Sequence, residues 1–226
     1  MTSSLVLCGI SIGNPLDIPV RTIEALKSCD FILCEDTRTA GRLLSSLSIG
    51  KPLRSYFNYN EQKRVDELRK ELQTKELRIA LISEAGMPLI ADPGYRVVNL
   101  FHELGLNVEA IPGPTAFVMA LVMSGFPLSQ FSFLGFWPTK TKDRKQAISL
   151  VESGQHPIAF YESPMRIVKT LRWLAEANPD LLVFVVKELT KNYETHWRGS
   201  ADEVANQIES STLKGEFTVV AYCSSK

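Results

Sequence analysis

The stretch SEAGMPLIADPG, residues 83–94, sets the fold class of this chain because it joins a strand pattern to a helix pattern. The apolar run at residues 78–82 predicts a buried strand, and the apolar periodicity of residues 95–104 predicts a helix. Gly86 allows a ligand to approach the backbone closely, and Asp92, followed by proline, is typical of a helix N-cap. In an open α/β sheet, ligands bind at such carboxyl ends of strands.

The rest of the chain repeats this alternation and then changes character. Before residues 112–114 (Pro-Gly-Pro), apolar runs alternate with helical patterns, which predicts a mostly parallel sheet covered on both faces. After them, strand patterns cluster with fewer crossovers, which predicts a mixed sheet. We therefore expect an α/β protein of two lobes, residues 1–112 and 113–226. The expected strands are residues 5–8, 31–34, 53–56, 78–82 and 108–111 in the first lobe, and 131–134, 157–160, 181–186 and 217–222 in the second.

Composition narrows the possible functions. The chain has 226 residues, of which 45% are hydrophobic, so a sizeable core is expected. Lys plus Arg equals Asp plus Glu, 25 each, so any nucleic-acid partner requires a local basic patch. No signal peptide pattern and no apolar run of about 20 residues is visible, which predicts a soluble, cytoplasmic protein. The four cysteines, without a Cys-x-x-Cys pair, are expected to be reduced and mostly buried: Cys8, Cys29, Cys34 and Cys223.

Three loops rich in Gly, Pro, Ser and Ala follow strands of the first lobe. They are residues 9–14, 83–94 and 112–116. They contain neither the Gly-x-Gly-x-x-Gly of dinucleotide sites nor the Gly-Lys-Ser/Thr of nucleoside triphosphatases. The three histidines and four cysteines show no metal-ligand spacing, so no metal is predicted. These patterns indicate a small-molecule cleft built mainly of backbone.

A series of short motifs runs in order along nearly the whole chain. The series comprises residues 12–18, 34–38, 60–61, 85–86, 88–90, 92–94, 112–114, 133–138, 160–164 with Arg166, 187–191 and 214–216. In order and spacing these motifs resemble the tetrapyrrole methylase-like (class III) S-adenosylmethionine-dependent methyltransferases. Within that family, the chain is most similar to the members that methylate a cytidine 2′-hydroxyl of 16S rRNA.

The resemblance implies two α/β lobes with a cleft for S-adenosylmethionine between them, a homodimer, and 16S rRNA or the small ribosomal subunit as partner. Carried over motif by motif, the cofactor-binding residues would be Ile12, Ala85, Gly86, Met87, Pro88, Ile90, Thr115, Ala116, Tyr161, Leu189 and Gly215. The segments around Asp36 and Lys191 would lie towards the methyl acceptor.

Transfer of a methyl group to a ribose hydroxyl needs in-line orientation and either a base or a cation at the developing alkoxide. The candidate catalytic residues are Glu35, Asp36, Arg38 and Lys191. Each of the last three also has a structural interpretation. Asp36 fits a helix N-cap, Arg38 a surface salt bridge, and Lys191 an ordinary ion pair with Glu188.

The chain departs from the family pattern at several positions. Glu84 and Met87 stand where the family has Asp and Thr, and Phe57, Tyr59 and Met165 stand where it usually has His. Histidine supplies a group that titrates near neutral pH, which Phe and Met lack. Two alternatives therefore stay open: the same cofactor with a small-molecule or protein acceptor, or an S-adenosylmethionine-binding module without catalysis.

A basic segment at residues 140–145 follows Phe136 and Trp137. One interpretation is an RNA contact, in which cations meet phosphates and an aromatic ring stacks on a base. The other is the solvated start of a helix.

Overall fold

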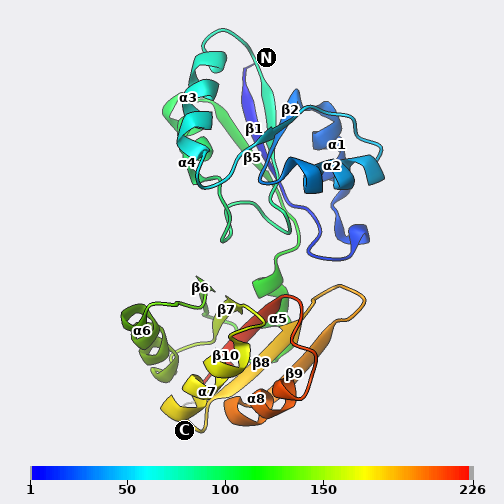
Figure 1. Ribbon diagram of the computed structural model, residues 1–226. Helices are drawn as coiled ribbons and strands as arrows, with labels where there is room; N and C mark the ends of the chain where they lie inside the picture. Colours follow the sequence, from blue (N-terminus) through cyan, green and yellow to red (C-terminus); the bar gives the residue numbers. More distant parts are fainter. Residues whose placement is uncertain (1, 224–226) are drawn as a thin grey trace. The chain divides into compact units, whose positions relative to one another are not determined.

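The computed structural model describes residues 2–223, and the chain divides into two compact units, Met1–Pro114 and Thr115–Lys226 (Figure 1). The first unit therefore ends two residues after Pro112, where the first expected lobe ends. Each unit has its own sheet and its own core. No helix among the described residues has the length and apolar content needed to span a membrane.

The first unit contains a five-stranded sheet with the order β3-β2-β4-β1-β5. Every pairing is parallel, which confirms the expected parallel sheet. Parallel strands align their carboxyl ends at one edge, so the loops that follow β1, β2 and β4 meet there. The strands are β1 (Ser4–Cys8), β2 (Phe31–Cys34), β3 (Leu53–Ser55), β4 (Arg78–Leu81) and β5 (Asn107–Ile111).

Helices cover both faces of this sheet. Successive strand residues point to opposite faces, so Val6 packs with α1 and α2, whereas Leu5 packs with α3 and α4. Burial on both faces accounts for the continuous apolar runs of β1, β2 and β4. The helices are α1 (Val20–Ser28), α2 (Thr37–Ser46), α3 (Glu61–Leu72) and α4 (Tyr95–Glu103), and a 3₁₀ turn η1 (Pro15–Asp17) precedes α1.

The start of α4 differs from the expected Asp92 N-cap, and that expectation is wrong. The N-cap position belongs to Gly94, with φ 148°. The free N–H groups of the first turn are satisfied from other elements: the Gly94 N–H donates to Glu61 Oε1 at 3.0 Å, and the Val97 N–H donates to the Tyr56 hydroxyl at 3.2 Å. Because these distant groups cap the helix, Asp92 stays in the loop before it.

The second unit contains a mixed five-stranded sheet with the order β6-β7-β10-β8-β9. Strands β6 and β7 are parallel and the other pairings are antiparallel, which confirms the expected mixed sheet. Helix α5 covers one face, and α6, α7 and α8 cover the other. The strands are β6 (Ser132–Phe136), β7 (Ile158–Glu162), β8 (Leu182–Lys187), β9 (Thr195–Ser200) and β10 (Phe217–Tyr222), and the helices are α5 (Ala116–Ser124), α6 (Thr141–Glu152), α7 (Ile167–Ala177) and α8 (Ala201–Glu209).

Candidate functional site

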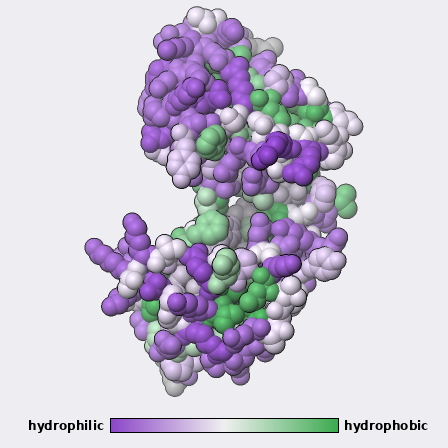
Figure 2. Space-filling model, viewed as in Figure 1, coloured by the Kyte–Doolittle hydropathy of each residue, from purple (hydrophilic) through white to green (hydrophobic). Residues whose placement is uncertain are grey.

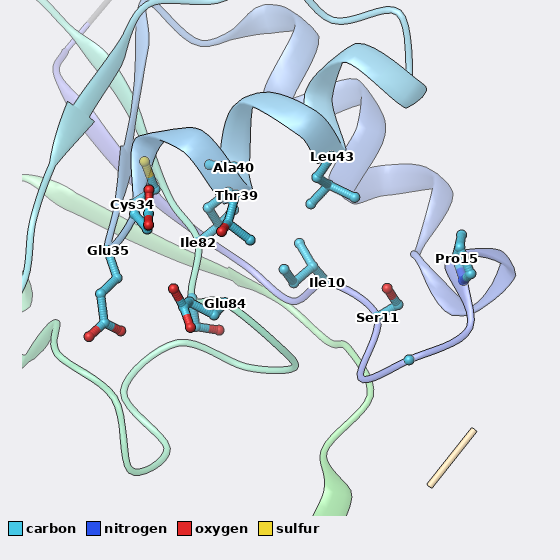
Figure 3. Close-up of a pocket in the computed structure, with 13 residues that line it drawn as sticks. Ile10, Ser11, Pro15, Cys34, Glu35, Thr39, Ala40, Leu43, Ile82 and Glu84 are labelled. Atoms are coloured by element: carbon cyan, nitrogen blue, oxygen red, sulfur yellow. The ribbon is translucent and has the colours of Figure 1, made fainter. Parts of the chain in front are cut away.

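A cavity of about 260 Å³ lies in the first unit at the carboxyl ends of β1, β2 and β4 (Figure 3). Three segments line it: the loop after β1, the β2–α2 junction, and the start of the loop after β4. One end is apolar and the other carries carboxylates, as Figure 3 shows for Leu43 and Ile10 against Glu35 and Glu84. The lining residues are Ile10, Ser11, Gly13, Pro15, Cys34, Glu35, Asp36, Thr39, Ala40, Leu43, Ile82, Ser83 and Glu84.

The carboxylates at the acidic end of the cavity interact electrostatically with one another and with Asp92, which lies in the loop beyond the lining residues. Burial raises the pKa of Glu35, and the nearby charge of Glu84 adds to the shift. Burial raises the pKa of Asp92 to about 6; the charges of Glu35 and Glu84 add to this, and a hydrogen bond from Ser83 opposes it. Like charges held close together make loss of the second proton harder. The group therefore includes a carboxyl that exchanges a proton near neutral pH.

Asp36 and Arg38 form a local pair at the start of α2. The Asp36 side chain accepts the Arg38 backbone N–H at 2.7 Å, so Asp36 is the N-cap of the helix. It also binds the Arg38 guanidinium at 2.9 Å, and the Arg38 side chain is 86% exposed. Hydrogen bonds from the Arg38 side chain and backbone lower the pKa of Asp36 to about 2. Asp36 is thus an anion that caps a helix, and a weak proton acceptor.

The loops after β1 and β4 are joined by backbone hydrogen bonds. The Ile10 N–H donates to the Gly86 carbonyl at 2.9 Å, and the Gly86 N–H donates to the Ser11 carbonyl at 3.3 Å. Gly86 has φ +75°, and a Cβ there would lie 3.0 Å from the Pro114 carbonyl oxygen and 3.1 Å from Ile12 Cγ2. The structure thus brings Ile12 and Gly86 together beside the third loop.

Gly9 and Gly113 allow the loops after β1 and β5 to touch. A Cβ on Gly9 would lie 2.6 Å from Gly113 Cα and 2.6 Å from Met87 Sδ. The two loops are in backbone contact here, so a side chain on either glycine would collide with the opposite loop. The Met87 thioether packs here, where the family has a hydroxyl. Of the neighbouring loop residues, Pro88 is buried, whereas Ala85 and Ile90 are exposed.

The backbone of two loops is held in a conformation that side chains disfavour. Among the described residues outside glycine, positive φ occurs at Leu89 and Ala91 in the loop after β4, at Glu188 and Thr190 after β8, and at Ser48. Such residues cost about 1–3 kcal/mol each and cluster at ligand sites. Those in the two loops flank Ile90 and Leu189, which the resemblance assigns to the cofactor.

The loop after β8 places Lys191 between two carboxylates. Its Nζ lies 3.0 Å from Glu188 Oε1 and 2.9 Å from Glu216 Oε2. Burial lowers the pKa of Lys191, but Glu216 and Glu188 outweigh that effect, so the pKa is raised. Gly215, with φ +104°, lies against the Glu188 side chain, since a Cβ there would come within 2.6 Å of it. Lys191 is therefore a fixed cation rather than a base.

The remaining cofactor candidates of the second unit lie at the ends of β7, β8 and α5. The Tyr161 ring packs edge-on against Phe133 and Phe136, with centroids 5.0 and 5.5 Å apart. Thr115 occupies the N-cap position of α5, of which Ala116 is the first residue. Leu189 packs against the apolar cluster formed by α5 and the sheet.

The aromatic and thioether residues that replace histidines are mostly at the surface. Tyr59 is 97% exposed and Met165 is 94% exposed, while the Phe57 ring lies 6.5 Å from that of Tyr59. A histidine at position 59 or 165 would be equally solvated, so the cavity of the first unit is built without these positions.

Asp92 is the residue that reasoning from the sequence missed. Its sequence context, aspartate before proline and ahead of a helix, is the pattern of a cap. The sign that it was something else is its place in a strand-to-helix loop at the carboxyl edge of a parallel sheet.

Known proteins resemble the chain in sequence and in structure. The sequence model of one protein family, the tetrapyrrole (corrin/porphyrin) methylases, matches residues 4–205 of this chain. Proteins named ribosomal RNA small subunit methyltransferase I are 39% identical in Thermotoga maritima, covering 96% of both chains, and 40% identical in Mycoplasmopsis pulmonis, covering 97% of this chain and 98% of that one.

Solved structures share the fold at low identity. A diphthine synthase has a TM-score of 0.72 at 13% identity, covering 97% of this chain and 90% of its own. A cobalt precorrin-4 methyltransferase of cobalamin biosynthesis has a TM-score of 0.68 at 18% identity, covering 97% and 94%. The chain belongs to the tetrapyrrole methylase family and is an S-adenosylmethionine-dependent methyltransferase.

Proposed function

We propose that this enzyme methylates the 2′-hydroxyl of a cytidine in 16S rRNA, with the small ribosomal subunit or its rRNA as partner. The observation that carries the proposal is the near-full-length similarity, 37–40% identity, to proteins named ribosomal RNA small subunit methyltransferase I. The relative from Bacillus subtilis, at 37% identity, extends beyond the match, which covers 74% of its length.

We propose that the methyl donor is bound by Ile12, residues 85–88 and Ile90 in the first unit and by Thr115, Ala116, Tyr161, Leu189 and Gly215 in the second. One feature of the structure supports a nucleoside-type donor: the three loops that would hold it pack against one another through Gly9 and Gly86, where a Cβ would collide with a neighbouring loop. S-adenosylmethionine supplies a methyl group activated by a positively charged sulfur. The protein's task is to orient the acceptor oxygen in line with that carbon.

Glu35 and Asp92 are proposed to take up the proton. As the oxygen–methyl bond forms and the sulfur–methyl bond breaks, the acceptor hydroxyl loses its proton to this carboxyl pair. A base with a pKa near 6 is mostly ionised at neutral pH and still accepts a proton effectively. Asp36, with a pKa of about 2, is poorly suited to this role.

Arg38 and Lys191 are proposed to act through charge. Arg38 is 86% exposed and fixed to Asp36 at one edge of its guanidinium, so other donors remain available to an anionic acceptor. Lys191 stays protonated, and a cation near the acceptor stabilises a developing alkoxide.

The decisive experiment incubates the protein with labelled S-adenosylmethionine and small ribosomal subunits from a strain that lacks the modification. Label recovered as 2′-O-methylcytidine at one site is the expected result. Donor binding without transfer to RNA would favour a small-molecule or protein acceptor, or a module without catalysis. Absence of donor binding at millimolar concentration would contradict all three functions.

The cytoplasm as location and the homodimer as assembly are proposed on the family resemblance. Sedimentation at micromolar concentration tests the second: a mass of two chains, each of 25.2 kDa, is expected.

A further inference from the structure

The start of α6 carries a cluster of lysines without acidic partners. Lys140, Lys142 and Lys145 are exposed, and none forms an ion pair within the described part of the chain. Most arginines in the described part of the chain, by contrast, do form ion pairs. Unpaired lysines occur elsewhere, but nowhere else between residues 2 and 223 do three fall within six positions. Figure 2 shows long hydrophilic side chains projecting outward over α6.

The cluster is anchored to α7 through an aromatic residue. The Arg144 guanidinium lies 4.0 Å from the centre of the Trp173 ring, and Lys169 Nζ lies 5.0 Å from it. Arg144 also donates to the Thr139 carbonyl at 3.3 Å. Arg144 therefore holds the first turn of α6 in place, and Lys169 extends the positive surface onto α7.

Acidic residues of the helical layer gather on its other side. Arg172 of α7 pairs with Asp202 and Glu209 of α8. The acidic residues of α6 are Asp143 and, at its last position, Glu152. The layer thus has a basic flank at the start of α6 and an acidic flank on α8, although the chain as a whole carries no net charge.

The structure separates the two aromatic residues before this cluster. Trp137 is 2% exposed and packs on Phe160 with ring centroids 4.5 Å apart, so it is a core residue and has no free face for a base. Phe136 is 60% exposed at the end of β6, four residues before Lys140, and its ring contacts that of Tyr161. One accessible aromatic therefore precedes the lysines by a few residues along the chain.

We propose that this surface, formed by Lys140, Lys142, Lys145, Lys169 and Phe136, binds the sugar–phosphate backbone of the RNA substrate and stacks on one unpaired base. The inference rests on the proposed rRNA methylation and assigns its RNA-binding surface. Lysines on mobile stems neutralise phosphates without reading sequence, and their contribution arises from counterion release. An exposed aromatic adds a contact that is insensitive to salt.

The test compares two triple variants that each lose three positive charges. One is Lys140→Ala, Lys142→Ala and Lys145→Ala; the control is Lys63→Ala, Lys70→Ala and Lys75→Ala, which removes three exposed lysines of the first unit that also form no ion pair. Binding to unmodified small ribosomal subunits is measured between 50 and 300 mM salt, together with single-site methyl transfer and thermal unfolding.

The α6 variant should lower the slope of log affinity against log salt by about 2–3, roughly one for each lost contact. Its affinity at 50 mM salt should fall at least about tenfold, with kcat at saturating subunits and the affinity for S-adenosylmethionine unchanged. The control variant should match the wild type. Phe136→Leu should weaken binding by about fivefold or more at every salt concentration and leave the slope unchanged.

An α6 variant with the same slope and affinity as the control would overturn the proposal while leaving the proposed function intact. Wild-type protein that binds subunits through α6 but transfers no methyl group would support the binding surface and contradict the proposed function. Wild-type protein without any subunit binding would overturn the surface, and the transfer assay would then report on the function separately.

Discussion

Substitution of Gly86 by alanine tests whether the loop after β4 forms the donor site. Gly86 has φ +75°, and the new Cβ would lie 3.0 Å from the Pro114 carbonyl oxygen and 3.1 Å from Ile12 Cγ2. The left-handed backbone costs alanine about 1–2 kcal/mol. The close contacts force the neighbouring loops apart by a few tenths of an ångström and add about 1–3 kcal/mol, as overpacking does elsewhere.

Gly105→Ala is the matched control, because it separates the two effects. Gly105 has φ +65°, close to that of Gly86, but a Cβ there meets nothing within 4 Å. It should therefore show the backbone cost alone, which for a unit of this size lowers the melting temperature by about 4 °C or more. Gly86→Ala should lower it further.

The affinity for S-adenosylmethionine, measured by calorimetry, is the deciding quantity. Gly105→Ala should bind the donor as the wild type does, and Gly86→Ala should bind it at least about tenfold more weakly, which corresponds to about 1.4 kcal/mol. If the two variants bind the donor equally well, the packing of Gly86 against Ile12 and Pro114 has no part in the donor site.

Three further predictions concern other parts of the molecule. In the folded protein the pKa of Asp92 is about 6, against 3.8 ordinarily, so its contribution to stability falls as the pH rises from about 4 to about 6. Asp92→Asn should therefore unfold at a higher temperature than the wild type at pH 7 and at the same temperature below pH 4. Identical melting temperatures of the two proteins at both pH values would refute the pKa shift. Arg38→Ala and Lys191→Ala should reduce methyl transfer with the donor affinity nearly unchanged, as single-turnover assays and calorimetry would show, and loss of donor binding in both would mean that they face the donor instead of the acceptor. Ser200→Ala removes the capping box that Ser200 forms with Glu203 at α8 and should cost about 1 kcal/mol in urea unfolding without altering transfer, whereas reduced transfer would implicate this surface in the reaction.

Local patterns predicted the elements of both units because their causes are local. The apolar run at residues 78–82 became β4, and the apolar run at residues 31–34 became β2 with the same bounds. Asp36 caps α2 by accepting the backbone N–H of Arg38, which is only two residues away, so the sequence was enough to suggest this cap. Such interactions span a few residues, so spacing along the chain is enough to foresee them.

The expectations that failed or stayed open depended on partners far away in sequence. Asp92 resembled a cap, but Glu61 and Tyr56, more than thirty residues earlier, satisfy the first turn of α4 in its place. Phe136 and Trp137 are adjacent in sequence, yet one is exposed and the other buried. Phe136 is the last residue of β6 and Trp137 follows the strand, and the expected strand ended at residue 134, before both.

The fold class, the parallel and mixed character of the two sheets, the family motifs and the glycine-rich loops could all be read from residue order, because hydrophobic period and backbone freedom are properties of short segments. The proton affinity of Asp92, the pairing of Lys191 with Glu216, and the packing of Arg144 and Lys169 against Trp173 required the folded chain. Burial and charge–charge distance depend on which strands become neighbours, and that follows from the packing of each whole unit rather than from any one segment.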